Sequence, residues 1–406
     1  MIAKPEEVGL SSPRLARIGE HWQRYIDAGK LAGALTLIAR RGRVAYCEAR
    51  GHLETERRRP VTPDSVWRIY SMTKPITSVG LMMLYEQGHF QLNDPVSRFI
   101  PSWGDLGVFV SGHHPLFVTS PLARSMTIRD LLSHTSGLTY GSTEGSNVDA
   151  AYRLLAVADR TRPGYTLTDM IATLAELPLE FAPGTRWNYS VATDVLGHLI
   201  EVMSGQRLDA YLAEHVFAPL GMRDTGFVIR DDQVPRFAAN YERQGDGRLK
   251  LIDDPSRSQY AQVSFLSGGG GLVSTALDYH RFTAMLLNGG ELDGMRLLGR
   301  KTVELMTTNH LPDGRDIAEL ALAGSFTDTP YAGVGFGLGF SVVQSPARAH
   351  IPGSPGAYAW GGAASTAFWV DPAEEMIVIF MTQLMPASTF PLTRELRVLS
   401  YSALID

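Results

Sequence analysis

The stretch IYSMTKPITSVGLMML, residues 69–84, is the strongest indication of both the fold and the chemistry of this chain. Its apolar side chains recur at helical spacing beyond Pro75, which predicts a helix that begins close to Ser71. Residues three apart share a helix face, so Lys74 Nζ can reach Ser71 Oγ, and the start of the helix offers backbone N–H groups to a developing oxyanion. A nucleophile, a base and an electrophilic donor therefore fit within one turn.

Lys74 has to be neutral to act as a base. A lysine with an ordinary pKa near ~10.4 is neutral in only about one molecule in 2500 at pH 7, a penalty of about 4.6 kcal/mol. We therefore predict that the fold lowers the pKa of Lys74, through burial or a neighbouring cation, and that a nearby phenol shares the proton transfer.

Two further segments supply partners for this site. WNYSV, residues 187–191, follows a Pro-Gly turn and precedes a helical pattern that ends at Gly205, so Tyr189 can point into a cleft or simply pack at the helix start. AWGGAA, residues 359–364, precedes a strand-like run. Its paired glycines let the backbone approach a ligand, so the Ala363 N–H can form an oxyanion hole with that of Ser71, although a plain bulge in a sheet also fits.

Outward from these motifs, the pattern predicts an antiparallel sheet and a helical insertion. The first part of the chain is predicted to contain a helix from Ser12 and a hairpin of strands at 33–40 and 43–49. The last part is predicted to contain strands at 365–370 and 376–382 before a closing helix. We predict an α/β (α+β) fold, with a sheet-containing domain of residues 1–74 and 251–406 and a mostly helical domain of residues 75–250. Residues 107–126 show no steady period and fit either a pocket wall or a surface excursion.

Composition excludes several classes of protein. The 406 residues hold 42 acids and 37 bases, a net charge of -5, which offers no basic surface for nucleic acid or an anionic membrane. The single cysteine, Cys47, closes no disulfide within the chain, and His113 and His114 lack partners at a metal-ligand spacing. The first residues show no secretory signal and no run of about 18 apolar residues occurs, so we expect a cytoplasmic protein without a membrane anchor.

Taken together, the motifs resemble the serine β-lactamase and penicillin-binding protein superfamily, and within it the class C β-lactamase-like esterases called family VIII carboxylesterases. The resemblance extends to HTSGL at 134–138, VLGHLIEVMSGQ at 195–206, PLGMRDTGF at 219–227 and SGGGGLVST at 267–275. It implies a β-lactamase/transpeptidase-like fold without a metal or organic cofactor. It also implies that Ser71 is the acyl-accepting nucleophile, Lys74 its activator and Tyr189 the partner in proton transfer, with the Ser71 and Ala363 amides as the oxyanion hole.

Two departures from the β-lactamases point to the esterase branch. Val191 stands where the β-lactamase motif Tyr-x-Asn has its asparagine, and Trp360-Gly361-Gly362 replaces Lys-Thr-Gly. An apolar Trp360 in place of a cation favours a neutral acyl group over a charged one. We expect Trp360, Gly361, Gly362 and Val191 to bind the substrate, and we expect poor hydrolysis of β-lactams.

The sequence thus predicts a serine carboxylesterase for small neutral esters with short to medium acyl chains. Three alternatives use the same fold: an acyltransferase, a weak β-lactamase or D-amino-acid peptidase, and a binding protein without catalysis. A Ser-His-Asp triad through His134 is disfavoured, because HTSGL is a structural segment in the resembled family and Lys74 already supplies a base. The oligomeric state is unknown from the sequence.

Overall fold

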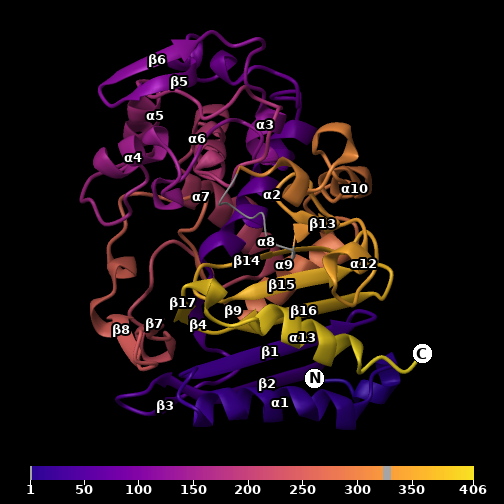
Figure 1. Ribbon diagram of the computed structural model, residues 1–406. Coiled ribbons are helices and arrows are strands. Elements are labelled where there is room, and N and C mark those ends of the chain that lie inside the picture. The colour runs from indigo at the N-terminus through magenta and orange to yellow at the C-terminus, as the bar shows by residue number, and fades with distance from the viewer. Residues whose placement is uncertain (1, 323–330) are drawn as a thin grey trace.

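The computed structural model describes residues 2–322 and 331–406, and its largest feature is an eight-stranded sheet (Figure 1). The strands are β1 (Gly33–Arg40), β2 (Arg43–Glu54), β3 (Arg59–Pro60), β12 (Val334–Phe336), β13 (Ser341–Val343), β14 (Tyr358–Gly361), β15 (Ala367–Asp371) and β16 (Met376–Met381). They pair antiparallel in the order β12-β13-β14-β15-β16-β1-β2-β3. The two ends of the sequence share this sheet, as predicted, because β1 pairs with β16.

The predicted hairpin at the start of the chain is present. Arg41 and Gly42 join β1 to β2 and have φ angles of 51° and 74°, the left-handed backbone that two-residue hairpin turns require. Strand β2 runs on to Glu54 rather than ending near residue 49, because Gly51 still pairs with Gly33. Gly51 interrupts the alternation of apolar residues, so the sequence pattern did not indicate this part of the strand.

Helices cover both faces of the sheet, on which side chains alternate. On one face α1 (Ser12–Asp27) and α13 (Leu392–Tyr401) pack with Ile38 and Val378 in one apolar cluster. On the other face α9 (Ala276–Leu287) contacts β1, β15 and β16 and shares a cluster with Leu37 and Ile379. The predicted fold class, an antiparallel sheet flanked by the terminal helices, is confirmed.

A second group of helices lies beside the sheet, around α2 (Thr73–Glu86) and α6 (Ala192–Ser204) (Figure 1). Residues 73–82 of α2 are all buried, so this helix is enclosed on all sides. The remaining helices are α3 (Ile128–Leu132), α4 (Asn147–Leu154), α5 (Leu167–Leu174), α7 (Leu208–Leu212), α8 (Ala218–Leu220), α10 (Arg300–Met306), α11 (Ile317–Leu320) and α12 (Pro346–Ala349), with a π-helical turn at Ala213–Phe217. The division into domains at residues 74 and 251 stays a prediction.

Short strands also occur outside the large sheet. β4 (Val66–Arg68) pairs with β9 (Val273–Thr275), and β17 (Leu384–Met385), β7 (Asn240–Arg243) and β8 (Leu249–Asp253) form a three-stranded sheet. A small hairpin joins β10 (Glu291–Leu292) to β11 (Met295–Arg296). The pairing of β4 with β9 holds the chain just ahead of Ser71.

The segment 107–126, expected to be irregular, contains a hairpin of β5 (Val108–His113) and β6 (Leu116–Ser120). A bulge between Phe109 and Ser111 shifts the register of the pair, which breaks the alternation that would have revealed the strands. The hairpin leaves Val110, Leu116 and Val118 more than half exposed.

Within residues 2–322 and 331–406, no group of three or more His, Cys, Asp or Glu side chains is placed to hold a metal ion. The same residues include no helix long and apolar enough to cross a membrane. Cys47 is half-buried, and burial raises the pKa of its thiol. The absence of a cofactor and the cytoplasmic location stay predictions.

Candidate active site

Ser71 lies in a 3₁₀ turn, Tyr70–Met72, that leads directly into α2. A hydrogen bond anchors the residue that precedes this turn: the Ile69 N–H donates to Leu272 O at 3.1 Å. Tyr70 has a φ of 43°, a left-handed conformation that is costly for a bulky side chain. Strain of this kind concentrates at functional sites, and here it lies next to the predicted nucleophile.

Lys74 is enclosed in the protein and only 1% exposed. Its Nζ lies 3.4 Å from Ser71 Oγ, 3.0 Å from the Tyr140 hydroxyl and 2.7 Å from Gly269 O. A protonated lysine has three N–H donors and no acceptor, whereas the neutral amine has two donors and one lone pair. When neutral Lys74 donates to Gly269 O and Tyr140, its lone pair is left to accept the hydrogen of the Ser71 hydroxyl.

The surroundings of Lys74 favour that neutral form. The pKa of Lys74 is lowered to about 7, mainly by burial; the carboxylate of Asp194 acts in the opposite direction, and the Arg160 guanidinium adds a smaller lowering effect. About half of the amine is therefore neutral at pH 7, instead of about one molecule in 2500. Both causes expected from the sequence, burial and a neighbouring cation, are present.

Tyr189 precedes α6 and brings a phenol to the same place. Its ring centroid lies 4.4 Å from Lys74 Nζ. Its hydroxyl accepts a hydrogen bond from the Trp360 indole N–H at 3.2 Å and forms another with the Ser71 side chain. Burial raises the pKa of Tyr189 above its ordinary value, and these two hydrogen bonds oppose that effect. The phenol thus keeps its proton at neutral pH and lies where it can pass one on.

The third predicted segment packs directly on the turn that holds Ser71. A Cβ added to Gly362, which follows β14, would lie 2.6 Å from the Ile69 carbonyl oxygen. Only a glycine allows this approach. Gly361 is half-buried, and Ala363, the next residue after Gly362, is exposed. An oxyanion hole formed by the Ser71 and Ala363 amides stays a prediction.

Two of the residues that we expected to bind substrate are largely buried. Val191 is 1% exposed, and its N–H donates to Thr139 O at 3.3 Å. Trp360 is 8% exposed, and its indole packs on Tyr189 and Phe336 with ring centroids 5.3 and 5.2 Å away. Contact of Val191, Trp360, Gly361 and Gly362 with a substrate stays a prediction, but Trp360 has a polar contact that the sequence did not indicate.

His134 is part of the framework around Tyr189. It is 1% exposed, its Nδ1 lies 3.2 Å from Ser190 Oγ, and its ring centroid lies 5.0 Å from that of Tyr189. Burial lowers the pKa of His134 well below its usual range, and the charge of Lys74 adds to this. The imidazole is therefore neutral, and it packs against the ring of Tyr189.

Sequence reasoning missed four groups that surround Lys74: Tyr140, Arg160, Asp194 and the carbonyl of Gly269. Tyr140 and Gly269 lie next to the HTSGL segment and in SGGGGLVST, and Asp194 lies just ahead of VLGHLIEVMSGQ, so the resemblance marked their neighbourhoods but not the residues. Nothing in the sequence around Arg160 signals a role.

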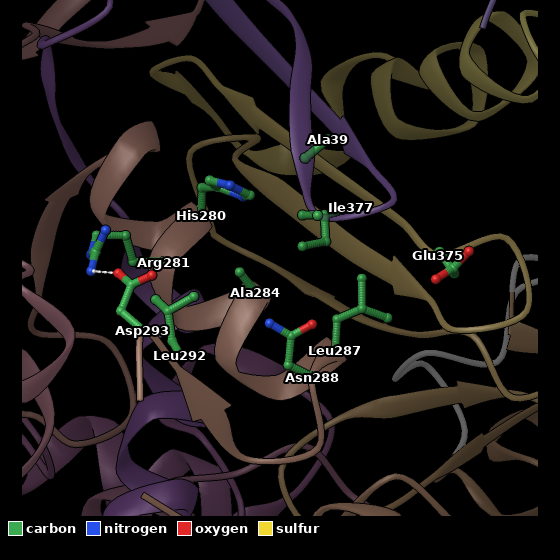
Figure 2. Close-up of a pocket in the computed structure, with 11 residues that line it drawn as sticks. Ala39, His280, Arg281, Ala284, Leu287, Asn288, Leu292, Asp293, Glu375 and Ile377 are labelled. Carbon is green, nitrogen blue, oxygen red and sulfur yellow. Dashed lines mark hydrogen bonds and ion pairs between the residues drawn. The ribbon is translucent and has the colours of Figure 1, made fainter. Parts of the chain in front are cut away.

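A cavity of about 210 Å³ lies elsewhere, between α9 and the sheet. Figure 2 shows its lining, which includes His280, Ala284, Leu287 and Ile377. None of its lining residues belongs to the group around Ser71. The cavity is therefore separate from the group of Ser71, Lys74 and Tyr189.

Comparisons with known proteins find relatives that cover most of this chain. Residues 18–401 match the family described as Beta-lactamase. Protein Rv1367c of Mycobacterium tuberculosis is 36% identical over 364 residues, which cover 89% of this chain and 88% of that protein. Esterase EstB of Burkholderia gladioli is 32% identical over 419 aligned positions, which cover 98% of each chain. Among solved structures, EstCE1, described as a hydrolase with promiscuous acyltransferase activity, has a TM-score of 0.81 at 29% identity and covers 96% of this chain and 99% of its own.

Proposed function

The chain belongs to the Beta-lactamase family, and from this premise we propose that it is a serine carboxylesterase that forms an acyl-enzyme on Ser71. One observation carries the proposal: the enclosed Lys74 amine, with a pKa of about 7, lies 3.4 Å from Ser71 Oγ. Such an amine can take the proton of a serine hydroxyl at neutral pH without the penalty of an ordinary lysine.

Acylation begins when Ser71 Oγ attacks the carbonyl carbon of the ester and its proton passes to Lys74 Nζ. The oxygen of the tetrahedral intermediate accepts hydrogen bonds from the amides of Ser71 and Ala363. As the intermediate collapses, the bond to the alcohol breaks, and the proton held by Lys74 reaches the departing oxygen through the Tyr189 hydroxyl. The alcohol leaves and the acyl group stays on Ser71.

Deacylation runs the same path with water. A water molecule attacks the acyl carbon while Tyr189 and Lys74 take its proton. The bond to Ser71 Oγ breaks, the serine regains the proton, and a carboxylic acid leaves. The Trp360 indole N–H, which donates to the Tyr189 hydroxyl, supports the phenol oxygen whenever negative charge builds on it.

The proposed substrates are neutral esters with short to medium acyl chains. The segment 360–363 that borders Ser71 reads Trp-Gly-Gly-Ala and brings no cation to the acyl group. The 32% identity to an esterase over the whole chain supports this class of substrate.

A panel of 4-nitrophenyl esters with acyl chains of increasing length, run beside a chromogenic cephalosporin, tests the substrate class. We expect kcat/KM for the best ester to exceed that for the cephalosporin. Faster turnover of the cephalosporin than of every ester would reject the proposal.

The nucleophile is tested separately. We expect Ser71→Ala to leave a folded, inactive protein that a serine-directed phosphonate no longer labels. Thermal unfolding close to that of the wild type shows that the loss is chemical. Full labelling of Ser71→Ala would overturn the assignment of the nucleophile.

A second candidate, acyl transfer to an alcohol at the same site, is favoured by the similarity to EstCE1, a hydrolase with promiscuous acyltransferase activity. Comparing acid and new ester formed from one aryl ester, with and without added alcohol, separates the two reactions. Predominant ester formation at low alcohol concentration identifies a transferase.

A further inference from the structure

The glycine segment Ser267–Gly271 holds the charged groups around Lys74 in fixed places. Lys74 Nζ donates to Gly269 O and Arg160 Nη1 donates to Gly270 O, both at 2.7 Å. On the same segment, Asp194 Oδ1 accepts from the Gly269 N–H at 3.0 Å and from Ser267 Oγ at 2.6 Å. An amine, a guanidinium and a carboxylate are thus bound to adjacent peptide units.

The segment can lie there only because it consists of glycines. A Cβ on Gly269 would lie 2.6 Å from Asp194 Oδ2, and a Cβ on Gly268 would lie 2.7 Å from Thr193 O. Both positions are therefore pressed against the start of α6. This close packing fixes the distances between the three charged groups, because side chains could not be accommodated between them.

Arg160 is held by neutral hydrogen-bond acceptors rather than by a direct ion pair. Besides Gly270 O, its Nη1 donates to the Tyr260 hydroxyl at 2.9 Å, and its guanidinium lies 5.3 Å from the ring centroid of Tyr70. No carboxylate in the described part of the chain lies within 4.0 Å of this guanidinium. Its positive charge acts on Lys74, where it opposes the effect of Asp194.

We propose that Arg160 is a positioning residue for the esterase reaction: its fixed charge, on the carbonyl next to the one that binds Lys74, favours the neutral amine of Lys74 and extends the activation of Ser71 to lower pH. Asp194 on the same segment acts against it. The inference rests on the proposed function in one respect, namely that Lys74 is the base for Ser71.

The other titratable groups that face Lys74 carry no charge near neutral pH. His134, after α3, stays neutral because burial lowers its pKa. Tyr140 and Tyr189, which contact Lys74 from the segments ahead of α4 and α6, keep their protons because burial raises their pKa values. Tyr70 and Tyr260, which face Arg160, are phenols as well. Arg160 and Asp194 are thus the two charges that adjust, in opposite directions, the protonation of Lys74 set mainly by burial.

The test is the pH profile of kcat/KM from pH 5.5 to 9.5 with a neutral aryl ester. In Arg160→Met we expect the acid limb to move to higher pH, so that the ratio of kcat/KM at pH 9 to that at pH 6 rises by about threefold or more, the effect of half a pH unit. Arg160→Lys, which keeps the charge, should restore most of the wild-type profile. Arg162→Met removes an exposed arginine two residues away and should leave the profile unchanged.

Asp194→Asn provides a test in the opposite direction. It keeps the shape of the side chain and removes the negative charge, so we expect the acid limb to move to lower pH. Opposite shifts in the two variants cannot come from general loosening of the site, which lowers kcat/KM by a similar factor at every pH. A uniform loss in Arg160→Met with an unmoved limb would overturn the proposal.

A second measurement separates failure of the inference from failure of the proposed function. The rate at which a neutral phosphonate labels Ser71 depends on the activation of the serine but not on ester turnover. Labelling with an acid limb that moves in Arg160→Met, in a protein that hydrolyses no ester, would support the inference and reject the esterase. If Arg160→Met does not fold, the Asp194→Asn and Arg160→Lys profiles still decide, because an unmoved limb in Asp194→Asn contradicts control by these charges.

Discussion

Replacing Gly362 with alanine should separate the third motif from the nucleophile. The new Cβ would lie 2.6 Å from the Ile69 carbonyl oxygen, and ordinary contact begins at 3.4 Å, so the two backbone segments must part by about 0.8 Å. That displacement moves the Ala363 amide relative to the Ser71 amide. Misplacement by about 1 Å can reduce catalysis about 10²-fold, and loss of one oxyanion donor has a similar effect. We expect kcat/KM to fall about 10²-fold, or about 2.7 kcal/mol.

The assay is kcat/KM for a neutral aryl ester, measured well below the unfolding temperature of each variant. Gly245→Ala is the matched control, because a Cβ there meets no atom within 4 Å, and it should keep wild-type activity. The rate of phosphonate labelling should fall with Gly362→Ala as well, since the phosphonyl oxygen uses the same donors. A folded Gly362→Ala protein with activity within about twofold of the wild type would refute an oxyanion hole at this segment.

Three further predictions concern the groups around Lys74, and a fourth concerns the end of α6. Tyr189→Phe should lower kcat/KM for the aryl ester by about 10²-fold or more, because the phenolic proton is lost. Tyr140→Phe removes one of the partners of Lys74 Nζ, and we expect a smaller loss, about tenfold, with thermal stability near that of the wild type. In the wild type the reactive neutral amine prevails above the Lys74 pKa of about 7 and disappears below it, so kcat/KM should be about tenfold higher at pH 8 than at pH 6; a flat profile contradicts this. Gly205→Ala should reduce the free energy of unfolding in urea by about 1 kcal/mol, because Gly205 ends α6 with a φ of 71°.

The sheet was predictable because its strands at both ends of the chain carry continuous or alternating apolar residues. Strand β16 is apolar from Met376 to Met381, and a two-residue turn joins β1 to β2. The β5–β6 hairpin was missed because it has a bulge and exposed apolar residues on its surface, so no simple period appears. Prediction worked where a strand is buried on both faces, as β1 and β16 are.

Within the site, the sequence indicated which residue types are needed but not all of their neighbours. The need to lower the pKa of Lys74 follows from acid–base chemistry alone. The charges that adjust this pKa come from distant segments, because only the fold brings Arg160, which lowers it, and Asp194, which raises it, near Lys74. Trp360 was expected to be an apolar wall, yet its N–H binds Tyr189; a buried indole usually finds such a partner, and that rule was the available signal.

The pairing of β1 with β16 also has a consequence for how the protein is made. Thr36 pairs with Phe380, about 340 residues later, so at 5–20 residues per second a ribosome needs about 20 to 70 s between the two. During that interval the hairpin of β1 and β2 presents an unpaired strand edge that could join another nascent chain. We therefore expect the yield of active protein to depend more on a chaperone that covers this edge during synthesis than on the rate at which β16 finally pairs with β1.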